Sequence, residues 1–327
     1  MVSREAVVWA YRLILGRDPE SDAVVEGHCR TENIEALRRG FFNSEEFASQ
    51  NLRERLPKAW VITPVMQGKR SMWVDLGDRF VSFGCLFDHY EPVETRFVTA
   101  VVRPGDVFID VGANVGWFTM LASTLVGEEG RVHAFEPRAD TADHLEKSVV
   151  LNELQNQVTV HRFALSDAEG HQLLVWTRNT ENPGGSFVVD HVPTPDMEVQ
   201  PVLLRRLDDL QLERVDFIKV DVEGAEMRVF RGAQTTLERC RPVVLSELSP
   251  DMLRRGSDST PEAVFSLFRT MSYRIFLIDS HDSNLYGKEL VGITWDSTKP
   301  LANFAMVPEE RFGPGGFADF KTMADGP

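Results

Sequence analysis

The sequence predicts an α/β fold: a mostly parallel β-sheet with helices on both faces, preceded by a small helical domain. Two observations support this prediction. From residue 106 onward, short segments rich in Val, Ile and Phe alternate with helix-like segments, which is the pattern of a parallel sheet whose strands are joined by helices. In addition, a glycine-rich turn at 110–116 joins the apolar segment 107–109 to the helix-like run 117–126, as in α/β folds that bind nucleotides.

Length and composition agree with this prediction. The 327 residues, 43% of them hydrophobic, can bury a substantial core. A formal net charge of −15 argues against nucleic acid as a partner, because phosphate binding requires clustered Lys and Arg. The composition leaves small molecules and glycans as possible substrates.

The cysteines and the hydropathy indicate where the protein resides. Cys29, Cys85 and Cys240 lie far apart in the sequence and are interpreted as reduced thiols of a cytoplasmic protein. No apolar run approaches the roughly 20 residues that span a bilayer, so we expect no integral membrane segment. The sequence does not indicate the oligomeric state.

The first 100 residues divide into two predicted regions. Residues 1–56 are expected to form a helical module, because apolar residues recur at helical spacing from Val7 to Leu15. Residues 57–100 are expected to form a lid or edge strands, with a hairpin that turns at Gly77.

Residues 101–327 are expected to form the ligand-binding domain. An irregular loop is expected at 176–200, where it would line the site, and helices are expected at 138–151 and 225–239. The last two strands are joined by a long connection, which predicts an antiparallel pair at the sheet edge. The seven predicted strands are 106–110, 131–135, 157–163, 215–221, 242–247, 273–279 and 303–308.

The glycine-rich turn has the pattern D-x-G-x-N-x-G, in which Gly112, Asn114 and Gly116 follow Asp110. A dinucleotide site would have a third glycine, and a carboxylate would repel a diphosphate. Asp110 instead suits a ligand that carries an ammonium group. Glu136 comes 20 residues after Gly116, at the end of the next predicted strand, where a carboxylate binds the hydroxyls of a ribose. The pattern therefore favours S-adenosylmethionine over a nicotinamide cofactor.

A second cluster of charged residues follows the strand predicted at 215–221. Lys219 and Asp221 share one face of that strand because they are two residues apart, and Glu223 follows them. Glu247 ends the next predicted strand and should lie at the same rim. We expect these four residues to be catalytic. Their three carboxylates could bind a divalent cation such as Mg²⁺, hold a substrate hydroxyl or act as a general base, and the sequence leaves these roles open.

These segments together resemble the FkbM family of S-adenosylmethionine-dependent methyltransferases, over roughly residues 90–250. The resemblance implies a Rossmann-like class I methyltransferase sheet of seven strands with a terminal antiparallel hairpin. It also implies O-methylation of a hydroxyl on a carbohydrate or a secondary metabolite. The motifs that carry the resemblance are Asp110–Thr119, Ala134–Pro137, Ala164–Asp167, Gly184–Ser186, Leu207–Asp209, Ile218–Glu226 and Arg241–Pro242 followed by Glu247.

The motifs complete the predicted site. Ser166 and Asp167 follow the third predicted strand, where polar groups commonly hold an adenine ring. The candidate metal ligands are Asp221, Glu223 and Glu247. The predicted cofactor-binding residues are Asp110, Gly112, Asn114, Gly116, Thr119, Glu136, Ser166, Asp167 and Asp221.

The first 56 residues resemble a helical module found beside enzymes of bacterial polysaccharide assembly, through the motifs Tyr11–Pro19 and Phe41–Phe47. This resemblance implies a biosynthetic partner enzyme and favours a carbohydrate acceptor. Two alternatives stay open. The chain could be a non-catalytic scaffold that binds S-adenosylmethionine within a polysaccharide-biosynthesis complex. Less in keeping with the glycine pattern, it could be a nicotinamide-dependent oxidoreductase.

Overall fold

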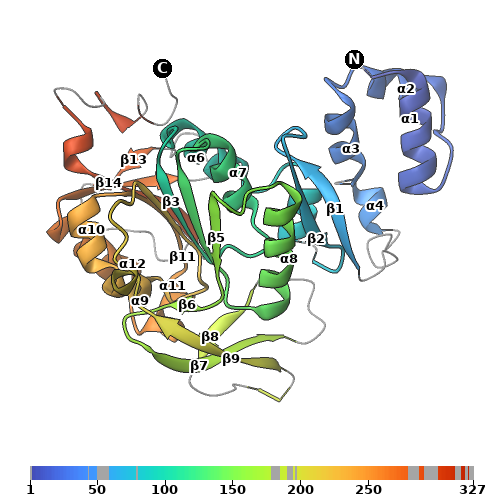
Figure 1. Cartoon of the computed structure of the whole chain (residues 1–327). Coiled ribbons are helices and arrows are strands. Elements are labelled where there is room, and N and C mark those ends of the chain that lie inside the picture. The colour runs from blue at the N-terminus through green and yellow to red at the C-terminus, as the bar shows by residue number, and fades with distance from the viewer. Residues whose placement is uncertain are drawn as a thin grey trace.

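The computed structural model describes residues 2–42, 44–49, 59–78, 80–177, 185–189, 194–195, 197–278, 287–290, 301–313, 318–320 and 323. Within these residues, the centre of the molecule is an eight-stranded sheet in the order β13-β12-β14-β11-β10-β3-β4-β5 (Figure 1). Its strands are β3 (Val107–Val111), β4 (Arg131–Phe135), β5 (Val158–His161), β10 (Phe217–Val220), β11 (Val243–Leu248), β12 (Tyr273–Ile278), β13 (Lys288–Glu289) and β14 (Ala302–Pro308).

The strand order reverses between β3 and β10. From β3 the sheet extends through β4 to β5, and the chain then returns to the other side of β3 for β10 and β11; all of these neighbours are parallel. In the β3–β10 pair, Asp110 lies opposite Lys219. Ligands of open α/β sheets bind at the carboxyl ends of the strands at such a reversal. The two motif-bearing strands are therefore neighbours at the place where a ligand site is expected.

The far edge of the sheet is antiparallel. Strand β14 lies between β11 and β12 and runs antiparallel to both, and the short strand β13 pairs with β12. Every one of the seven predicted strands is present in this sheet, with bounds within a few residues of those expected. The predicted Rossmann-like sheet with an antiparallel pair at its edge is confirmed.

Two apolar cores cover the two faces of the sheet, because successive residues of a strand point to opposite faces. Phe108 and Phe217 stack on one face with ring centroids 5.0 Å apart, whereas Ile109 and Ile218 belong to the other core. No helix in the described ranges is long and apolar enough to cross a membrane. The first face is covered by α6 (Pro92–Val101), α7 (Trp117–Leu125) and α8 (Ala139–Leu151), and the second by α9 (Glu226–Gly232), α10 (Gln234–Cys240), α11 (Pro250–Ser257) and α12 (Pro261–Thr270).

The helix predicted at 225–239 is two helices, α9 and α10. They are separated at Ala233, whose φ of −115° and ψ of 8° lie outside the helical region. Gly232 ends α9 where the backbone packs against the carbonyl oxygen of Ser166, and a Cβ at this position would overlap that oxygen. The break therefore has a tertiary cause, which the helical periodicity of the segment does not indicate.

A second, four-stranded sheet in the order β6-β9-β7-β8 is inserted between β5 and β10. The prediction of an irregular loop at 176–200 is therefore wrong for the described residues; 178–184, 190–193 and 196 lie outside them. The buried core of this sheet is small, which is why the sequence pattern did not reveal it. It consists of Ala164, Leu174, Val202 and Leu204. The strands are β6 (Ala164–Leu165), β7 (Gly170–Thr177), β8 (Phe187–Val189) and β9 (Met197–Arg205).

Residues 2–42 and 44–49 form a helical unit with a core of its own; the expected boundary at residue 56 lies outside the described residues. The core consists of Val2, Val7, Tyr11, Leu15, Val25, Leu37, Phe41 and Phe47, with the partly buried side chains that pack on them. The helices are α1 (Arg4–Ala10), the π-helix η1 (Tyr11–Leu15), α2 (Asp22–Cys29), α3 (Ile34–Phe42) and α4 (Glu45–Ser49).

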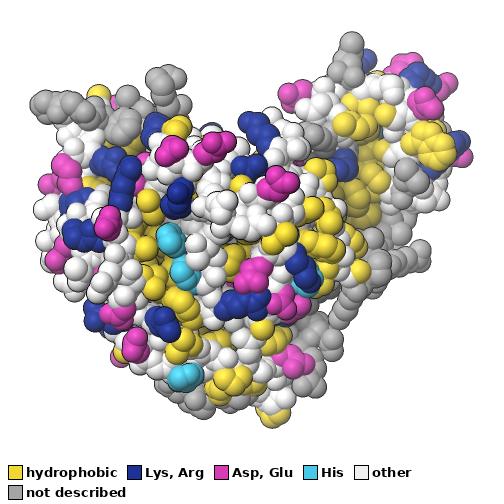
Figure 2. Space-filling model, in the orientation of Figure 1, with side chains coloured by type: hydrophobic (Ala, Val, Ile, Leu, Met, Phe, Trp, Pro, Cys, Tyr) yellow, Lys and Arg dark blue, Asp and Glu magenta, His cyan; other side chains and the backbone are white. Residues whose placement is uncertain are grey.

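The helical unit touches the rest of the chain and also exposes apolar surface. The ring of Phe42 lies 4.5 Å from that of Phe87, just after α5 (Val81–Leu86). Figure 2 shows hydrophobic side chains at the surface of this unit. Trp9 and Ile34 are large hydrophobic residues that are 50% and 55% exposed.

A two-stranded antiparallel sheet, β1 (Trp60–Val65) and β2 (Arg70–Asp75), follows the helical unit. Its turn lies at 66–69, where three consecutive residues have positive φ. The predicted turn at Gly77 is wrong, because Gly77 comes after β2 and leads into α5. Two glycines were available to a hairpin here, and the register of β1 on β2 uses the earlier one, Gly68.

The hairpin is fixed to α8 rather than to the main sheet. The backbone amide of Ser71 donates to Asn152 Oδ1 at 2.9 Å, and that of Trp73 donates to Ser148 Oγ at 2.9 Å. These side chains satisfy amides on the outer edge of β2, which would otherwise present unpaired backbone groups. The hairpin, α5 and α6 together make up the described part of the region expected at 57–100.

Removing residues 1–56 should leave a folded domain, because the helical unit has a separate core. We expect the shortened protein to stay soluble, to unfold in one cooperative thermal transition and to bind S-adenosylhomocysteine with unchanged affinity. Circular dichroism and calorimetry would measure these properties. Aggregation, or loss of cooperative unfolding, would show instead that the contact of Phe42 with Phe87 belongs to the core of the main domain.

Candidate active site

A cavity lies at the carboxyl ends of β3, β4 and β10, beside the inserted sheet. Its empty volume is about 1220 Å³, including the part that is open to solvent. The structure brings many of the predicted site residues together around this cavity. Those that line it are Gly112, Asn114, Glu136, Lys219, Asp221, Glu223 and Glu247.

The glycines of the 110–116 turn are required by packing. Gly112 and Gly116 have φ values of 79° and 97°. A Cβ on Gly112 would overlap the carbonyl oxygen of Asp221, and one on Gly116 would overlap the side chain of Leu145. Asn114 also has a positive φ, 50°. The turn thus holds the end of β3 against the end of β10.

Asp110 is buried beneath this turn. Its Oδ2 accepts a hydrogen bond of 2.6 Å from the hydroxyl of Thr119, and its Oδ1 has no partner among the described residues. Burial raises the pKa of Asp110, and the nearby ammonium of Lys219 opposes the rise. Asp110, Gly116 and Thr119 are not among the described residues that line the cavity. Thr119 therefore orients Asp110 beneath the site.

Glu136 presents a carboxylate to the cavity from the end of β4. Its Oε1 accepts from the amide of Arg138 at 2.8 Å and its Oε2 from the amide of Asn114 at 2.9 Å. Each carboxylate oxygen can accept about two hydrogen bonds, so each retains capacity for a ligand hydroxyl. Burial raises the pKa of Glu136 to about 7, although these amides oppose the rise. The arrangement is suited to binding two neighbouring hydroxyls.

Ser166 and Asp167 lie away from the cavity surface. The backbone amide of Ser166 donates to the carbonyl of Arg205 at 2.8 Å, and its hydroxyl donates to Asp167 Oδ1 at 3.2 Å. The neighbouring residues Phe163 and Leu165 line the cavity instead. The segment that carries the motif thus reaches the cavity through an aromatic and an aliphatic side chain rather than through the two predicted polar residues.

Lys219 and Asp221 form an ion pair at the end of β10, in which Lys219 is buried and Asp221 is half-buried. The distance from Lys219 Nζ to Asp221 Oδ2 is 3.0 Å, and the ammonium lies 4.6 Å from the ring centroid of Phe118. Burial lowers the pKa of Lys219, but the carboxylates of Asp221, Glu91 and Asp110 outweigh it and raise the pKa overall. Lys219 is therefore a fixed positive charge in the floor of the cavity.

Glu223 and Glu247 add two carboxylates beside this pair. Glu223 has a φ of 52°, and burial together with the charge of Asp221 raises its pKa to about 7. Burial, followed by the charges of Asp221 and Glu91, raises the pKa of Glu247. Glu223 can therefore exchange a proton near neutral pH, and Glu247 favours its protonated form.

Glu226 has a structural role. Its Oε1 accepts from the amide of Gly224 at 3.0 Å and from that of Val222 at 3.3 Å. These bonds shape the turn between β10 and α9. Burial raises the pKa of Glu226 to about 7, yet Glu226 is not among the described residues that line the cavity.

Sequence reasoning missed Glu91, which brings a further carboxylate to the cavity. Glu91 has a left-handed backbone, φ 40° and ψ 65°, directly before the proline that starts α6. Burial raises its pKa, Lys219 opposes the rise and Asp221 adds to it. The hydroxyl of Thr95 donates to the carbonyl of Tyr90 and accepts from the indole of Trp117, both at 2.9 Å. The only available signal was the polar run from residue 88 to 91 before a helix start.

A metal centre is not apparent in the part of the chain that the structure describes. No group of three His, Cys, Asp or Glu side chains there is arranged to hold a metal ion. Asp221 Oδ2 already accepts from the ammonium of Lys219, and a divalent cation beside that ammonium would be repelled. The candidate ligands Asp221, Glu223 and Glu247 therefore do not fit Mg²⁺ as they stand.

The fold and the cavity define a class of protein: an α/β enzyme that binds a nucleoside cofactor at the carboxyl ends of its central strands. The model of the methyltransferase FkbM domain matches residues 110–275, which is half of the chain. The chain belongs to the FkbM family and is an S-adenosylmethionine-dependent methyltransferase. The predicted family and enzyme class are confirmed, and the oxidoreductase alternative receives no support.

Three relatives show the range of proteins to which the chain is similar. It is 26% identical over 286 residues to the AMB antimetabolite synthetase AmbE of Pseudomonas aeruginosa, a match that covers 75% of this chain and 13% of that protein. It is 28% identical to the 31-O-demethyl-FK506 methyltransferase FkbM of Streptomyces tacrolimicus, covering 41% of this chain and 61% of that one. It is 25% identical to the hexuronic acid methyltransferase AglP of Haloferax volcanii, in a match that covers 46% of this chain and 59% of that protein. The matches thus span only part of each relative.

The Glu136→Ala variant should weaken binding of S-adenosylhomocysteine by roughly 10- to 150-fold, since hydrogen bonds to a charged group contribute about 1.5–3 kcal/mol each. Because the pKa of Glu136 is raised to about 7, the affinity of the wild-type protein should also depend on pH. The ionised carboxylate accepts from both hydroxyls, so affinity should be full above that pKa and fall as the pH drops through 7 toward 6. Calorimetry between pH 6 and 8 would measure it.

The matched control is Glu226→Gln, because Glu226 has a pKa raised to the same value but lies outside the cavity lining. It should retain the wild-type pH dependence, whereas Glu136→Gln should lose most of it. Equal behaviour of the two glutamine variants would contradict the role of Glu136.

Proposed function

We propose that the chain transfers a methyl group from S-adenosylmethionine to a hydroxyl of an uncharged acceptor, a carbohydrate or a secondary metabolite. One observation carries the proposal: among the residues that the structure describes, four carboxylates and one ammonium line one part of the cavity. The carboxylates belong to Glu91, Asp221, Glu223 and Glu247, and the ammonium to Lys219. Such a surface accepts hydrogen bonds from hydroxyl groups and repels carboxylates and phosphates.

The remainder of the cavity fits the cofactor. Glu136 offers acceptors for the ribose hydroxyls, and Phe163 and Leu165 offer apolar surface for an adenine ring. When bound, S-adenosylmethionine supplies an electrophilic methyl group on a sulfonium. The acidic lining suits that positive charge, and it suits the ammonium of the amino-acid end as well.

We assign the proton transfer to Glu223. Its carboxylate lines the cavity, and a pKa of about 7 matches a base that works near neutral pH. Glu223 would take the proton of the acceptor hydroxyl, while the bound cofactor would supply the methyl group by cleavage of its sulfur–methyl bond and leave as S-adenosylhomocysteine. Glu247, which favours its protonated form, donates a hydrogen bond to a second oxygen of the acceptor. Asp221 is held in place by its ion pair with Lys219, and the charges of the two groups balance each other.

We further propose that the reaction needs no divalent metal. Lys219 supplies a permanent positive charge beside Asp221, at 3.0 Å, where a metal would otherwise balance the carboxylates. Mg²⁺ usually retains several waters and one or two carboxylates, and it would have to displace this ammonium. The cation site is thus already filled by a side chain.

The acceptor class rests on charge. One relative is named for methylating a hexuronic acid, which carries a carboxylate, whereas the acidic lining here favours a neutral polyol. The N-terminal helical unit, in which Trp9 and Ile34 are exposed, is proposed to bind a large acceptor or a biosynthetic partner enzyme. We also propose that the protein is located in the cytoplasm.

Glu223→Gln should lower the rate constant for methyl transfer about 10²- to 10⁴-fold, the range for loss of a general base, and change the affinity for S-adenosylhomocysteine less than about threefold. Transfer of radiolabelled methyl groups to a panel of neutral glycosides and macrolides would identify an acceptor and measure the rate. Glu226→Gln is the control. Near wild-type turnover of Glu223→Gln would remove Glu223 from the mechanism, and cofactor binding with no methylated acceptor would favour the scaffold alternative.

A chelator tests the metal proposal. Dialysis against excess EDTA should leave methyl transfer unchanged, because the positive charge belongs to Lys219. Lys219→Met should abolish transfer at any concentration of Mg²⁺. Loss of activity in EDTA that Mg²⁺ restores would show that the carboxylates do hold a metal.

A further inference from the structure

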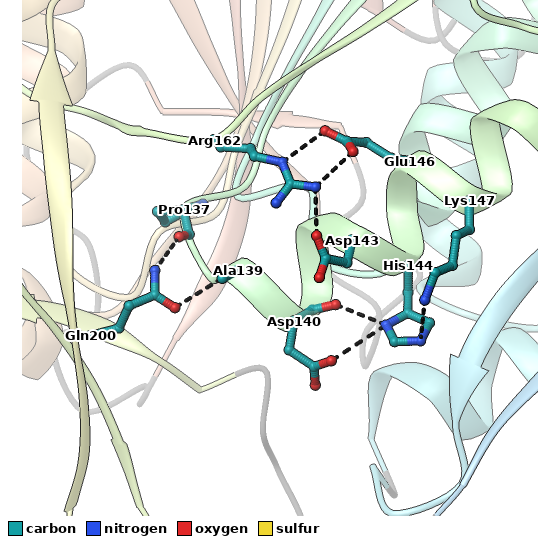
Figure 3. A network of polar contacts seen from close by, with 9 residues as sticks. All are labelled: Pro137, Ala139, Asp140, Asp143, His144, Glu146, Lys147, Arg162 and Gln200. Carbon is teal, nitrogen blue, oxygen red and sulfur yellow. Dashed lines mark hydrogen bonds and ion pairs between the residues drawn. The ribbon is translucent and has the colours of Figure 1, made fainter.

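The inserted sheet holds the loop that follows Glu136. Gln200, on β9, makes two hydrogen bonds to this loop through its side-chain amide (Figure 3). Nε2 donates to the carbonyl of Pro137 at 2.7 Å, and Oε1 accepts from the amide of Ala139 at 2.9 Å. The two bonds enclose residue 138 between them. A glutamine some sixty residues away in sequence thus fixes both ends of a short segment.

The segment needs this partner because α8 begins without a local cap. Its N-cap residue, Arg138, makes no side-chain capping hydrogen bond. The first amides of a helix have no partner within the helix, and that of Ala139 is the first of α8. Gln200 Oε1 accepts from this amide and so caps α8 from another sheet.

A second contact joins the inserted sheet to the same segment. The guanidinium of Arg138 lies 4.4 Å from the ring centroid of Trp176, on β7. The backbone amide of Arg138 donates to Glu136 Oε1. The residue that orients the Glu136 carboxylate is therefore held on both sides by the inserted sheet.

We propose that Gln200 is a positioning residue for cofactor binding, which acts by holding residues 137–139 so that the Glu136 carboxylate faces the cofactor ribose. The inference rests on the proposed assignment of Glu136 to that ribose. Without the clamp, the segment gains conformations in which the Arg138 amide no longer meets Glu136. Cofactor binding would then have to order the segment, at a cost in affinity.

The test variant is Gln200→Met, which removes both hydrogen bonds and keeps a side chain of similar length. We expect affinity for S-adenosylhomocysteine, measured by calorimetry, to fall about 3- to 10-fold, as for neutral hydrogen bonds that water partly replaces. In the cofactor-free protein, the amide hydrogens of Arg138 and Ala139 should exchange faster with solvent.

Arg162→Ala is the matched control. Arg162 binds Asp143 and Glu146 on the same helix, α8, at 2.6–2.8 Å (Figure 3), but these contacts are made away from residues 137–139. This variant should leave both the affinity and the exchange of the two amides unchanged. A drop in affinity equal to that of Gln200→Met would show that any loosening of α8 has the same effect, and would overturn the proposal.

The double variant Glu136→Ala/Gln200→Met separates positioning from a general effect. If Gln200 acts through Glu136, the double variant should bind S-adenosylhomocysteine as weakly as Glu136→Ala alone, within about twofold. Additive losses, or wild-type affinity in Gln200→Met, would overturn the role of Gln200. Wild-type affinity in Glu136→Ala would instead overturn the ribose assignment, and the inference would fall with it.

Discussion

The buried ammonium of Lys219 is the charge on which the rest of the site depends. Its side chain is 7% exposed and lies 3.0 Å from Asp221. Burial alone would favour the neutral amine, but the surrounding carboxylates keep it protonated. In return, the ammonium allows Asp110 to be buried and Glu91 to be half-buried near Asp221, because buried like charges without a counter-ion are strongly destabilising. The lysine therefore serves the whole cluster and not one partner.

Backbone packing places this charge where the strands reverse order. Gly112 lies against the carbonyl of Asp221 with no room for a side chain, so the two strand ends cannot separate without breaking that contact. Glu91 and Glu223 both have left-handed backbones, with φ values of 40° and 52°. Unusual backbone conformations persist only where the surroundings enforce them, and they are concentrated at functional sites. The carboxylate cluster is thus fixed by its turns as much as by its ion pair.

The sequence predicted the parts of the site that depend on local order. Glu136 and Asp221 follow strands directly, and a strand end places its next side chains at the rim of the sheet. Glu91 could not be found in this way, because it reaches the cavity through the packing of α6 beside the site. The role of Gln200 could not be predicted from the sequence either, since the inserted sheet pairs strands far apart in sequence around a small core. At Ser166 the sequence did not reveal that the neighbouring residues Phe163 and Leu165, and not Ser166 itself, line the cavity.

The charge of the cavity also links stability to the cofactor. Glu136 and Glu223 have pKa values near 7 in the folded chain, against an ordinary 4.5. The folded chain therefore binds protons that the unfolded chain releases between about pH 4.5 and 7, and its free energy of unfolding falls as the pH rises through this range. A cationic cofactor favours the ionised carboxylates, so its binding releases those protons and stabilises the fold most above pH 7. Among the described residues, Lys219 and Arg138 do not balance the five carboxylates that line this cavity, and the positive charge of the cofactor reduces the excess of negative charge.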